Sequence, residues 1–476
     1  MRSALFALAF LALQACAVDR STRVTQTLLP VTRVKGSAAE SRFELAARMA
    51  YFGTPGVSIA VVDGGKLVWA RGFGTLERGG STPVTPTTLF QAASISKVVT
   101  ATATLRLVDQ GKLSLDADVN GSLTSWKVPE NEFTSTEKVT LRRLMSHSAG
   151  INLGGFRGYG HSDKLPTVPQ ILDGTPPANT EAVRVKAVPG SAVSYSGGGV
   201  MIEQLVLTDV TGTPFPQLIH ELVFAPVGMR SSTFELSGAG VQSVAISHDA
   251  AGAPLAERYM IYPELAAAGL WSTPSDLVTW AISIAESRAG QPSLLSQASA
   301  KDMLTPQKGP LGLGPVIRGE GTALRFGHAG WAGGAHAEVI YFPELGKGAA
   351  VMLNGAAGRP LVREIMYAIA AEYGWPAEFA PDTIERVEVD QPTLDALVGR
   401  FAVTVDGSEI VCEVVRDRDQ LRLSSMKLGL HSPLVFTSKT AFVAIDTGDA
   451  FSLKQSDDGS IAGIEWGGIV LPRTPR

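Results

Sequence analysis

Apolar and polar positions change their period along residues 38–378, and each change predicts a different kind of element. Short alternating runs predict strands near both ends of this region. A nearly continuous apolar run after Ser94 predicts a helix that is buried on all sides and ends at Gly111. Strands at both ends with helices between them indicate an α+β fold. The predicted strands are 57–62, 67–70, 337–341 and 349–354.

The pattern changes after residue 378. Residues 379–392 are rich in proline and polar side chains, which is typical of a linker. From residue 393 to 476, short alternating runs are separated by polar turns such as 416–419 and 457–459. This spacing predicts a separate C-terminal domain, a small β-barrel or sandwich.

Length and composition agree with two domains. The chain has 476 residues, of which 45% are hydrophobic, so it can bury large cores. The formal net charge is −4 and no basic block occurs, so we expect no nucleic-acid partner.

The N-terminus predicts an export signal over residues 1–17. Met1-Arg2 is followed by an apolar run, Ala4 to Leu13, that is too short to span a bilayer. Two processing routes remain open: lipidation of Cys16, or ordinary cleavage after Ala17. A buried N-terminal helix is a third reading. We expect an exported protein, periplasmic or anchored to a membrane by lipid at Cys16, with residues 18–37 as an irregular tether.

A serine three residues before a lysine occurs three times, as Ser94/Lys97, Ser135/Lys138 and Ser424/Lys427. This spacing places both side chains on one helical face, where a neutral lysine can take the proton of a weak serine nucleophile. Only Ser94 and Lys97 open a predicted buried helix. The alternative for Ser94 is an ordinary helix cap with a solvated lysine.

Two glycine-rich segments could complete such a site. Tyr195, before Gly197-Gly198-Gly199, could relay a proton, although a tyrosine more often fills a gap in the core. His328 lies between Gly327 and Gly330, where small residues let the backbone approach a ligand. A lone histidine is more often structural, so each segment alone is weak.

Taken together, Ser94-Ile95-Ser96-Lys97, Tyr195-Ser196-Gly197 and His328-Ala329-Gly330 resemble the three motifs of the class C β-lactamase and penicillin-binding-protein family of serine hydrolases. The resemblance covers roughly residues 40–375 and implies an antiparallel sheet flanked by helices, with an all-helical subdomain. Residues 393–476 resemble the lipocalin-like β domain that some members append.

The resemblance also implies roles. Ser94 would attack an acyl carbon, Lys97 and Tyr195 would share the proton transfers, and the N–H groups of Ser94 and Trp331 would bind the oxyanion. His328, Gly330, Trp331 and Gly197 would lie at the substrate. No metal or cofactor is implied, and the partner would be a small-molecule or peptide substrate.

Two departures from the family pattern bear on the substrate. Gly197 stands where an asparagine is usual, and His328 stands where β-lactamases carry lysine. Both argue against an efficient β-lactamase and favour an esterase, an amidase or a D-amino-acid peptidase. The alternative outside enzymes is a non-catalytic cell-envelope binding protein on a degenerate hydrolase scaffold. A lipase of the G-x-S-x-G type and an H-E-x-x-H metallo-hydrolase lack their motifs in this sequence.

Overall fold

The computed structural model describes residues 19–36, 42–236, 244–405, 408–418, 420–425 and 430–474. The predicted export signal and Cys16 lie outside these residues. Within them, no helix combines the length and the apolar character needed to cross a membrane.

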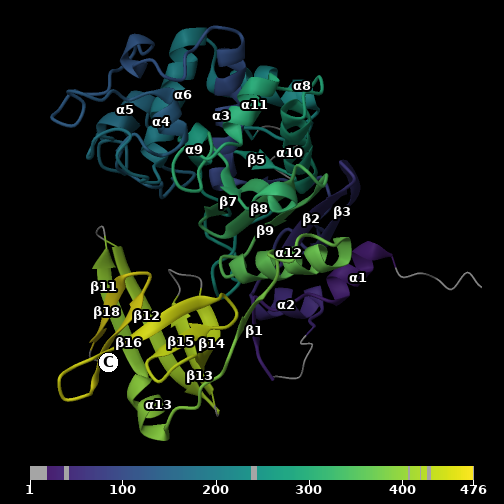
Figure 1. Cartoon of the computed structure of the whole chain (residues 1–476), viewed down its shortest axis with the longest axis vertical. Coiled ribbons are helices and arrows are strands. Elements are labelled where there is room, and N and C mark those ends of the chain that lie inside the picture. Colours follow the sequence, from purple (N-terminus) through teal and green to yellow (C-terminus); the bar gives the residue numbers. More distant parts are fainter. Residues whose placement is uncertain are drawn as a thin grey trace, which may run out of the picture.

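A six-stranded antiparallel sheet forms the centre of the N-terminal domain (Figure 1). Its strands are β2 (Gly56–Asp63), β3 (Lys66–Gly74), β6 (Val316–Arg318), β7 (Arg325–Ala332), β8 (Ala335–Phe342) and β9 (Lys347–Leu353). The order across the sheet is β3-β2-β9-β8-β7-β6. Alternate residues of β2 enter two different cores, Ile59 one and Ala60 the other, so its sequence is almost continuously apolar.

Helices cover both faces of this sheet. α10 (Pro274–Arg288) packs on one face, and α12 (Arg359–Tyr373) packs on the other with α2 (Leu45–Tyr51). The α+β prediction is confirmed.

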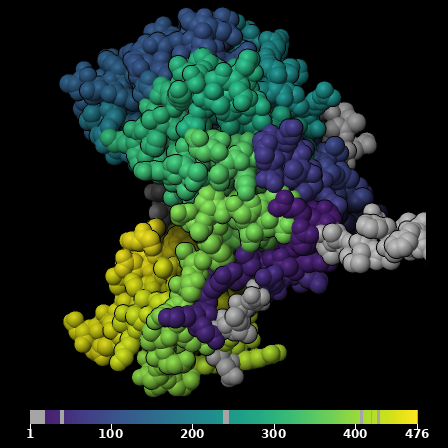
Figure 2. Space-filling model, turned by 45° about the vertical axis from the view of Figure 1, so that its right-hand side comes forward, coloured from purple at the N-terminus to yellow at the C-terminus, as the bar shows by residue number. Residues whose placement is uncertain are grey.

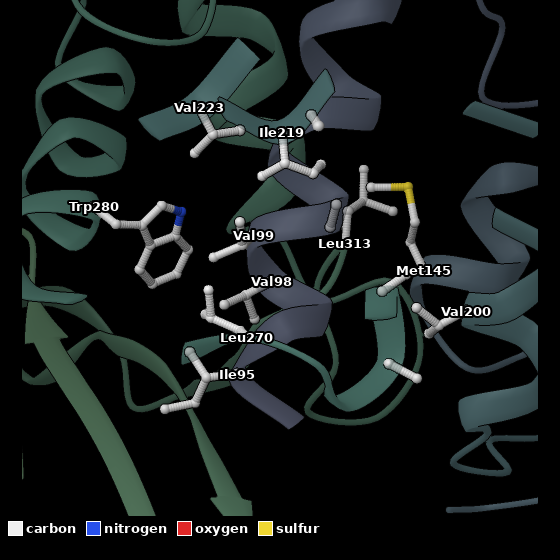
Figure 3. Close-up of a cluster of buried hydrophobic side chains, with 14 of the residues drawn as sticks. Ile95, Val98, Val99, Met145, Val200, Ile219, Val223, Leu270, Trp280 and Leu313 are labelled. Carbon is white, nitrogen blue, oxygen red and sulfur yellow. The ribbon is translucent and has the colours of Figure 1, made fainter. Parts of the chain in front are cut away.

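An all-helical subdomain surrounds α3 (Ser96–Asp109), whose residues from Ser96 to Leu105 are all buried. Apolar side chains from several neighbouring elements close around α3, as Figure 3 shows for Ile219 and Trp280 near Val99. The predicted buried helix is therefore confirmed. The neighbouring helices are α4 (Leu141–Met145), α5 (Val168–Asp173), α6 (Gly197–Thr211), α7 (Phe215–Ile219) and α9 (Leu265–Ala268).

The C-terminal domain is a closed eight-stranded antiparallel barrel. Each strand pairs with the next, and β11 pairs with β18 to close it. Cys412 is a buried residue of its core, as the alternating sequence predicts. The strands are β11 (Gly399–Val405), β12 (Ser408–Asp417), β13 (Gln420–Ser425), β14 (Leu430–Phe436), β15 (Ala441–Ala444), β16 (Asp449–Gln455), β17 (Ile461–Trp466) and β18 (Ile469–Thr474).

Residues 18–37 were predicted to be an irregular tether, but the described part, 19–36, contains a helix and a strand. α1 (Arg20–Gln26) packs on α12, where Arg20 and Arg23 both bond the carboxylate of Glu372. Burial of Val24 and Leu28 drives this docking, because both join the core beneath α12. The apolar residues of this stretch are separated by polar residues and by Pro30, so the sequence pattern did not predict an element.

The predicted linker also differs from a free chain. Its β10 (Asp382–Ile384) pairs in parallel with β1 (Thr32–Val34), so the two ends of the N-terminal domain lie side by side before the barrel begins. Figure 2 shows this N-terminal segment in purple against the light green residues that lead to the barrel.

The barrel contacts the N-terminal domain through a polar network. Arg48 of α2 bonds the fully buried Glu364 of α12 and also Asp446, in the turn after β15. The Tyr51 hydroxyl donates to Asp446 at 2.8 Å and accepts from Arg422 of β13 at 2.9 Å.

Candidate active site

Ser94 lies where the chain turns from β4 (Phe90–Gln91) into α3. A single 3-10 turn, Ala93–Ile95, makes this connection, and Ala93 has a φ of 47°, which is rare for a residue with a Cβ. Ser96 fixes the turn, because its hydroxyl donates to the Ala93 carbonyl at 2.5 Å and accepts from the Leu270 N–H at 3.0 Å. The serine is thus held at the start of a rigid helix.

Lys97 follows one helical turn later and faces Ser94. Its Nζ lies 3.0 Å from Ser94 Oγ and 2.7 Å from the carbonyl oxygen of Ala267. The side chain is buried, and this burial lowers the pKa of Lys97 to about 7. A large share of the lysine is therefore neutral at pH 7, as a general base requires.

Tyr195 approaches Ser94 from the loop before α6. Lys97 Nζ lies 5.1 Å from the centre of its ring. Tyr195 is 40% exposed, but burial of its hydroxyl raises the pKa to about 12, and a hydrogen bond with the Ser94 side chain offsets part of this rise. The phenol keeps its proton at pH 7, so it can pass a proton on.

His147 holds this tyrosine loop, and the sequence analysis did not select it. Its ring packs against that of Tyr195 at an angle of 42°, with centroids 4.3 Å apart. Its carbonyl accepts from the Ser194 N–H at 2.8 Å, and its Nδ1 accepts from the Ser196 N–H at 3.2 Å. Burial, followed by the charge of Lys97, lowers the pKa of His147 to about 3, so the ring is neutral with its proton on Nε2.

His328 lies on β7, and its ring centroid is 6.2 Å from that of Tyr195. Its Nδ1 lies 2.6 Å from the Ala329 carbonyl, which can only accept, so Nδ1 carries the proton. Burial, with the charge of Lys97, lowers the pKa of His328 to about 4. This ring therefore offers no positive charge to a substrate carboxylate at neutral pH.

β7 packs closely against the turn Ala93–Ile95, here called the serine turn. A Cβ on Gly330 would lie 2.0 Å from the Ala92 carbonyl oxygen, so only glycine permits this approach. Trp331 pairs with His336, one step from the pair Ala332–Ala335 that closes the hairpin. The Trp331 N–H belongs to the peptide that follows Gly330, the residue that contacts the serine turn.

The structure thus brings together Ser94, Lys97, Tyr195, His328, Gly330, Trp331 and Gly197. The other serines of the S-x-x-K pattern lie elsewhere: Ser135 in an exposed loop and Ser424 on the barrel. No group of three metal-ligating side chains occurs in the described part of the chain.

The sequence held a signal for His147. It lies in Ser146-His147-Ser148-Ala149-Gly150, a segment that looks like the family's connecting segments. The fold alone shows that the His147 carbonyl and ring accept hydrogen bonds from Ser194 and Ser196, the residues on either side of Tyr195.

The fold and this serine–lysine–tyrosine cluster define a serine hydrolase of the β-lactamase and penicillin-binding-protein type. The sequence model described as Beta-lactamase matches residues 44–373, most of the chain, so the protein belongs to this family.

Relatives agree with this assignment. Penicillin-binding protein 4 of Amycolatopsis lactamdurans is 27% identical over 69% of this chain and 88% of its own. Esterase EstB of Burkholderia gladioli is 30% identical over 38% of this chain and 47% of its own. The structure of the octameric penicillin-binding protein homologue from Pyrococcus abyssi matches with a TM-score of 0.61 and 25% identity, over 90% of this chain and 93% of that one.

Proposed function

We propose that the protein hydrolyses an ester or amide through an acyl-enzyme on Ser94. The observation that carries this proposal is the contact between Lys97 Nζ and Ser94 Oγ, 3.0 Å long, from a lysine whose pKa is lowered to about 7. A partly neutral amine at that distance can accept the serine proton as the hydroxyl attacks.

The remaining groups have roles in this proposal. Tyr195 passes the proton to the leaving group. The backbone N–H groups of Ser94 and Trp331 stabilise the oxyanion, while Gly330 lets β7 come close enough for that contact. Water then releases the acyl group.

The same site favours an uncharged substrate. The neutral ring of His328 stands where a β-lactamase has a lysine, and it gives a lactam carboxylate no ion pair. We therefore propose an esterase or amidase, or a D-amino-acid peptidase, with weak β-lactamase activity at most.

The test compares hydrolysis of p-nitrophenyl acetate by the protein without residues 1–17 and by its Ser94→Ala variant. We expect the variant to lose activity by at least about 100-fold, since the nucleophile is gone. Mass spectrometry of the protein with a slowly released ester should show one acyl adduct, on the peptide that contains Ser94. Equal rates in the two proteins, with no adduct, would instead support the binding-protein alternative.

We also propose that the protein is exported and anchored through lipid on Cys16, from the sequence of residues 1–17. The test is fractionation of cells that express the full chain or its Cys16→Ser variant. Recovery of both proteins in the membrane fraction would contradict the anchor, and retention of both in the cytoplasm would contradict export.

A further inference from the structure

Position 197 is crowded, so a side chain there would require Phe156 to move. A Cβ on Gly197 would lie 2.9 Å from Cε2 of Phe156 and 3.3 Å from the carbonyl oxygen of Gly154. The Phe156 ring therefore covers the backbone of Gly197, two residues after Tyr195. A polar side chain at this position is not merely missing, because an aromatic ring occupies its place.

Phe156 belongs to an apolar cluster that flanks the nucleophile. Its buried members are Ala93, Tyr262 and Ala332, and Phe156, Met260 and Ala268 pack against them. Ala93 directly precedes Ser94 and Ala332 directly follows Trp331. The cluster therefore lies beside both of the N–H groups assigned to the oxyanion.

Two contacts hold this cluster in shape: a bridge between two backbone segments, and a hydrogen bond from the side-chain amide of Gln91. Tyr159 and Ile261 form an antiparallel bridge, which ties the loop of Phe156 to the loop of Met260. The amide of Gln91, three residues before Ser94, donates to the Met260 carbonyl at 2.8 Å. The apolar surface is thus fixed relative to the serine before any substrate binds.

We propose that Phe156, Met260 and Tyr262, here called the apolar wall, bind the acyl part of the substrate. This inference rests on the proposed function and deepens it. The wall selects esters or amides whose acyl group is a hydrocarbon chain or an apolar side chain. It disfavours acyl groups with an amide beside the scissile carbonyl, because Phe156 offers that amide no hydrogen bond.

The test measures kcat/KM for p-nitrophenyl acetate, butyrate and N-acetyl-D-alaninate. Each methylene that enters an apolar site adds about 0.8 kcal/mol, so two add roughly tenfold or more. We expect butyrate to exceed acetate by about tenfold and to exceed the N-acetyl-D-alanyl ester. In Phe156→Ala we expect the butyrate-to-acetate ratio to fall several-fold towards one.

Matched control variants distinguish a change in specificity from a loss of folding. Leu67→Ala removes a surface apolar side chain of β3 and should keep the wild-type ratio. Phe156→Leu keeps an apolar group and should retain most of the preference. In Phe156→Ala with Gly197→Asn, the freed space admits an amide, so the N-acetyl-D-alanyl ester should gain relative to butyrate.

The outcomes separate this inference from the proposed function. Hydrolysis that persists in Ser94→Ala would contradict both the proposed function and the apolar wall. Activity that depends on Ser94, with no preference for butyrate or with a ratio unchanged in Phe156→Ala, would overturn the apolar wall alone. A faster D-alanyl ester with a free amino group would overturn it as well, because it would indicate recognition of a cation.

Discussion

At the scale of single residues, the site depends on groups whose ionisation the fold has shifted. Lys97 is buried beside Ser94, and the neighbouring rings of His147 and His328 are neutral. Tyr195, whose ring contacts that of His147 and lies near that of His328, keeps its proton. A lysine surrounded by uncharged groups loses its own proton near neutrality, which makes it a base without a carboxylate partner.

The first prediction concerns the pH dependence of this base. Below about pH 7 Lys97 is an ammonium ion and cannot accept a proton, so kcat/KM for a neutral ester should rise as the pH rises through about 7 and then level off. Lys97→Arg cannot become neutral in this range and should lose at least about 100-fold. A profile with no rise between pH 5 and pH 8 would contradict this role for Lys97.

A second prediction concerns His147 as a positioning residue for Tyr195. His147→Leu removes the acceptor for the Ser196 N–H, so the tyrosine should lose its alignment and kcat should fall about tenfold or more. KM should change little, because the substrate contacts remain. His147→Asn offers an acceptor and tolerates the residue's φ of 52°, so it should recover part of kcat. Equal kcat in both variants would indicate a role in packing only.

At the scale of elements, the site is a junction of three segments far apart in sequence. The serine turn, the loop before α6 and the edge of β7 meet, and each carries glycines or a residue with positive φ. The S-x-x-K spacing was readable because it lies within one helical turn. The sequence could not predict that β7 approaches Ala92, because this contact depends on the register of the whole sheet.

A third prediction tests this junction. Gly330→Ala places a Cβ 2.0 Å from the Ala92 carbonyl oxygen, so β7 must move away from the serine turn. We expect kcat to fall about 100-fold, with a loss of about 1–3 kcal/mol in the free energy of unfolding. Gly121→Ala is the matched control, since nothing lies within 4 Å of its Cβ. Wild-type kcat in Gly330→Ala would show that this close approach is not needed.

At the scale of the whole molecule, the barrel is joined to the hydrolase domain by more than a linker. Arg48 pairs with buried Glu364 and with Asp446 of the barrel, and Tyr51 bonds Asp446 from α2. Burial raises the pKa of Glu364 to about 7 despite Arg48, so this carboxylate depends on its cation to stay ionised. The network thus couples the core under α12 to the barrel.

A fourth prediction follows from this network. Arg48→Met leaves Glu364 buried without its cation and should cost about 3–5 kcal/mol of stability, seen as a lower Tm in calorimetry. Arg416→Met is the matched control: it breaks an ion pair with Asp395 whose side chains are 33% and 60% exposed, so the cost should stay below about 1 kcal/mol. Equal Tm values for the two variants would mean that the network adds no stability.

The strands of the barrel illustrate how far the sequence pattern reaches. Short alternating runs predict six of its strands, at 401–405, 409–415, 421–424, 441–445, 451–454 and 461–466, but no such run predicts β14 or β18. Both contain a proline, Pro433 and Pro472, which weakens the pattern of a strand. Closure into a barrel rather than a sandwich depends on the pairing of β11 with β18, a contact between the two ends of the domain.

The sequence by itself determined the α+β class, the buried helix after Ser94, the serine–lysine pair and the family, because these depend on local periodicity, on one helical turn or on motifs in order. The tertiary structure decided the rest. It placed Tyr195 against the rings of two neutral histidines, covered Gly197 with Phe156 and docked α1 on α12. Each of these is a contact between residues distant in the chain, and its energy comes from desolvation and close packing that exist only after the chain has folded.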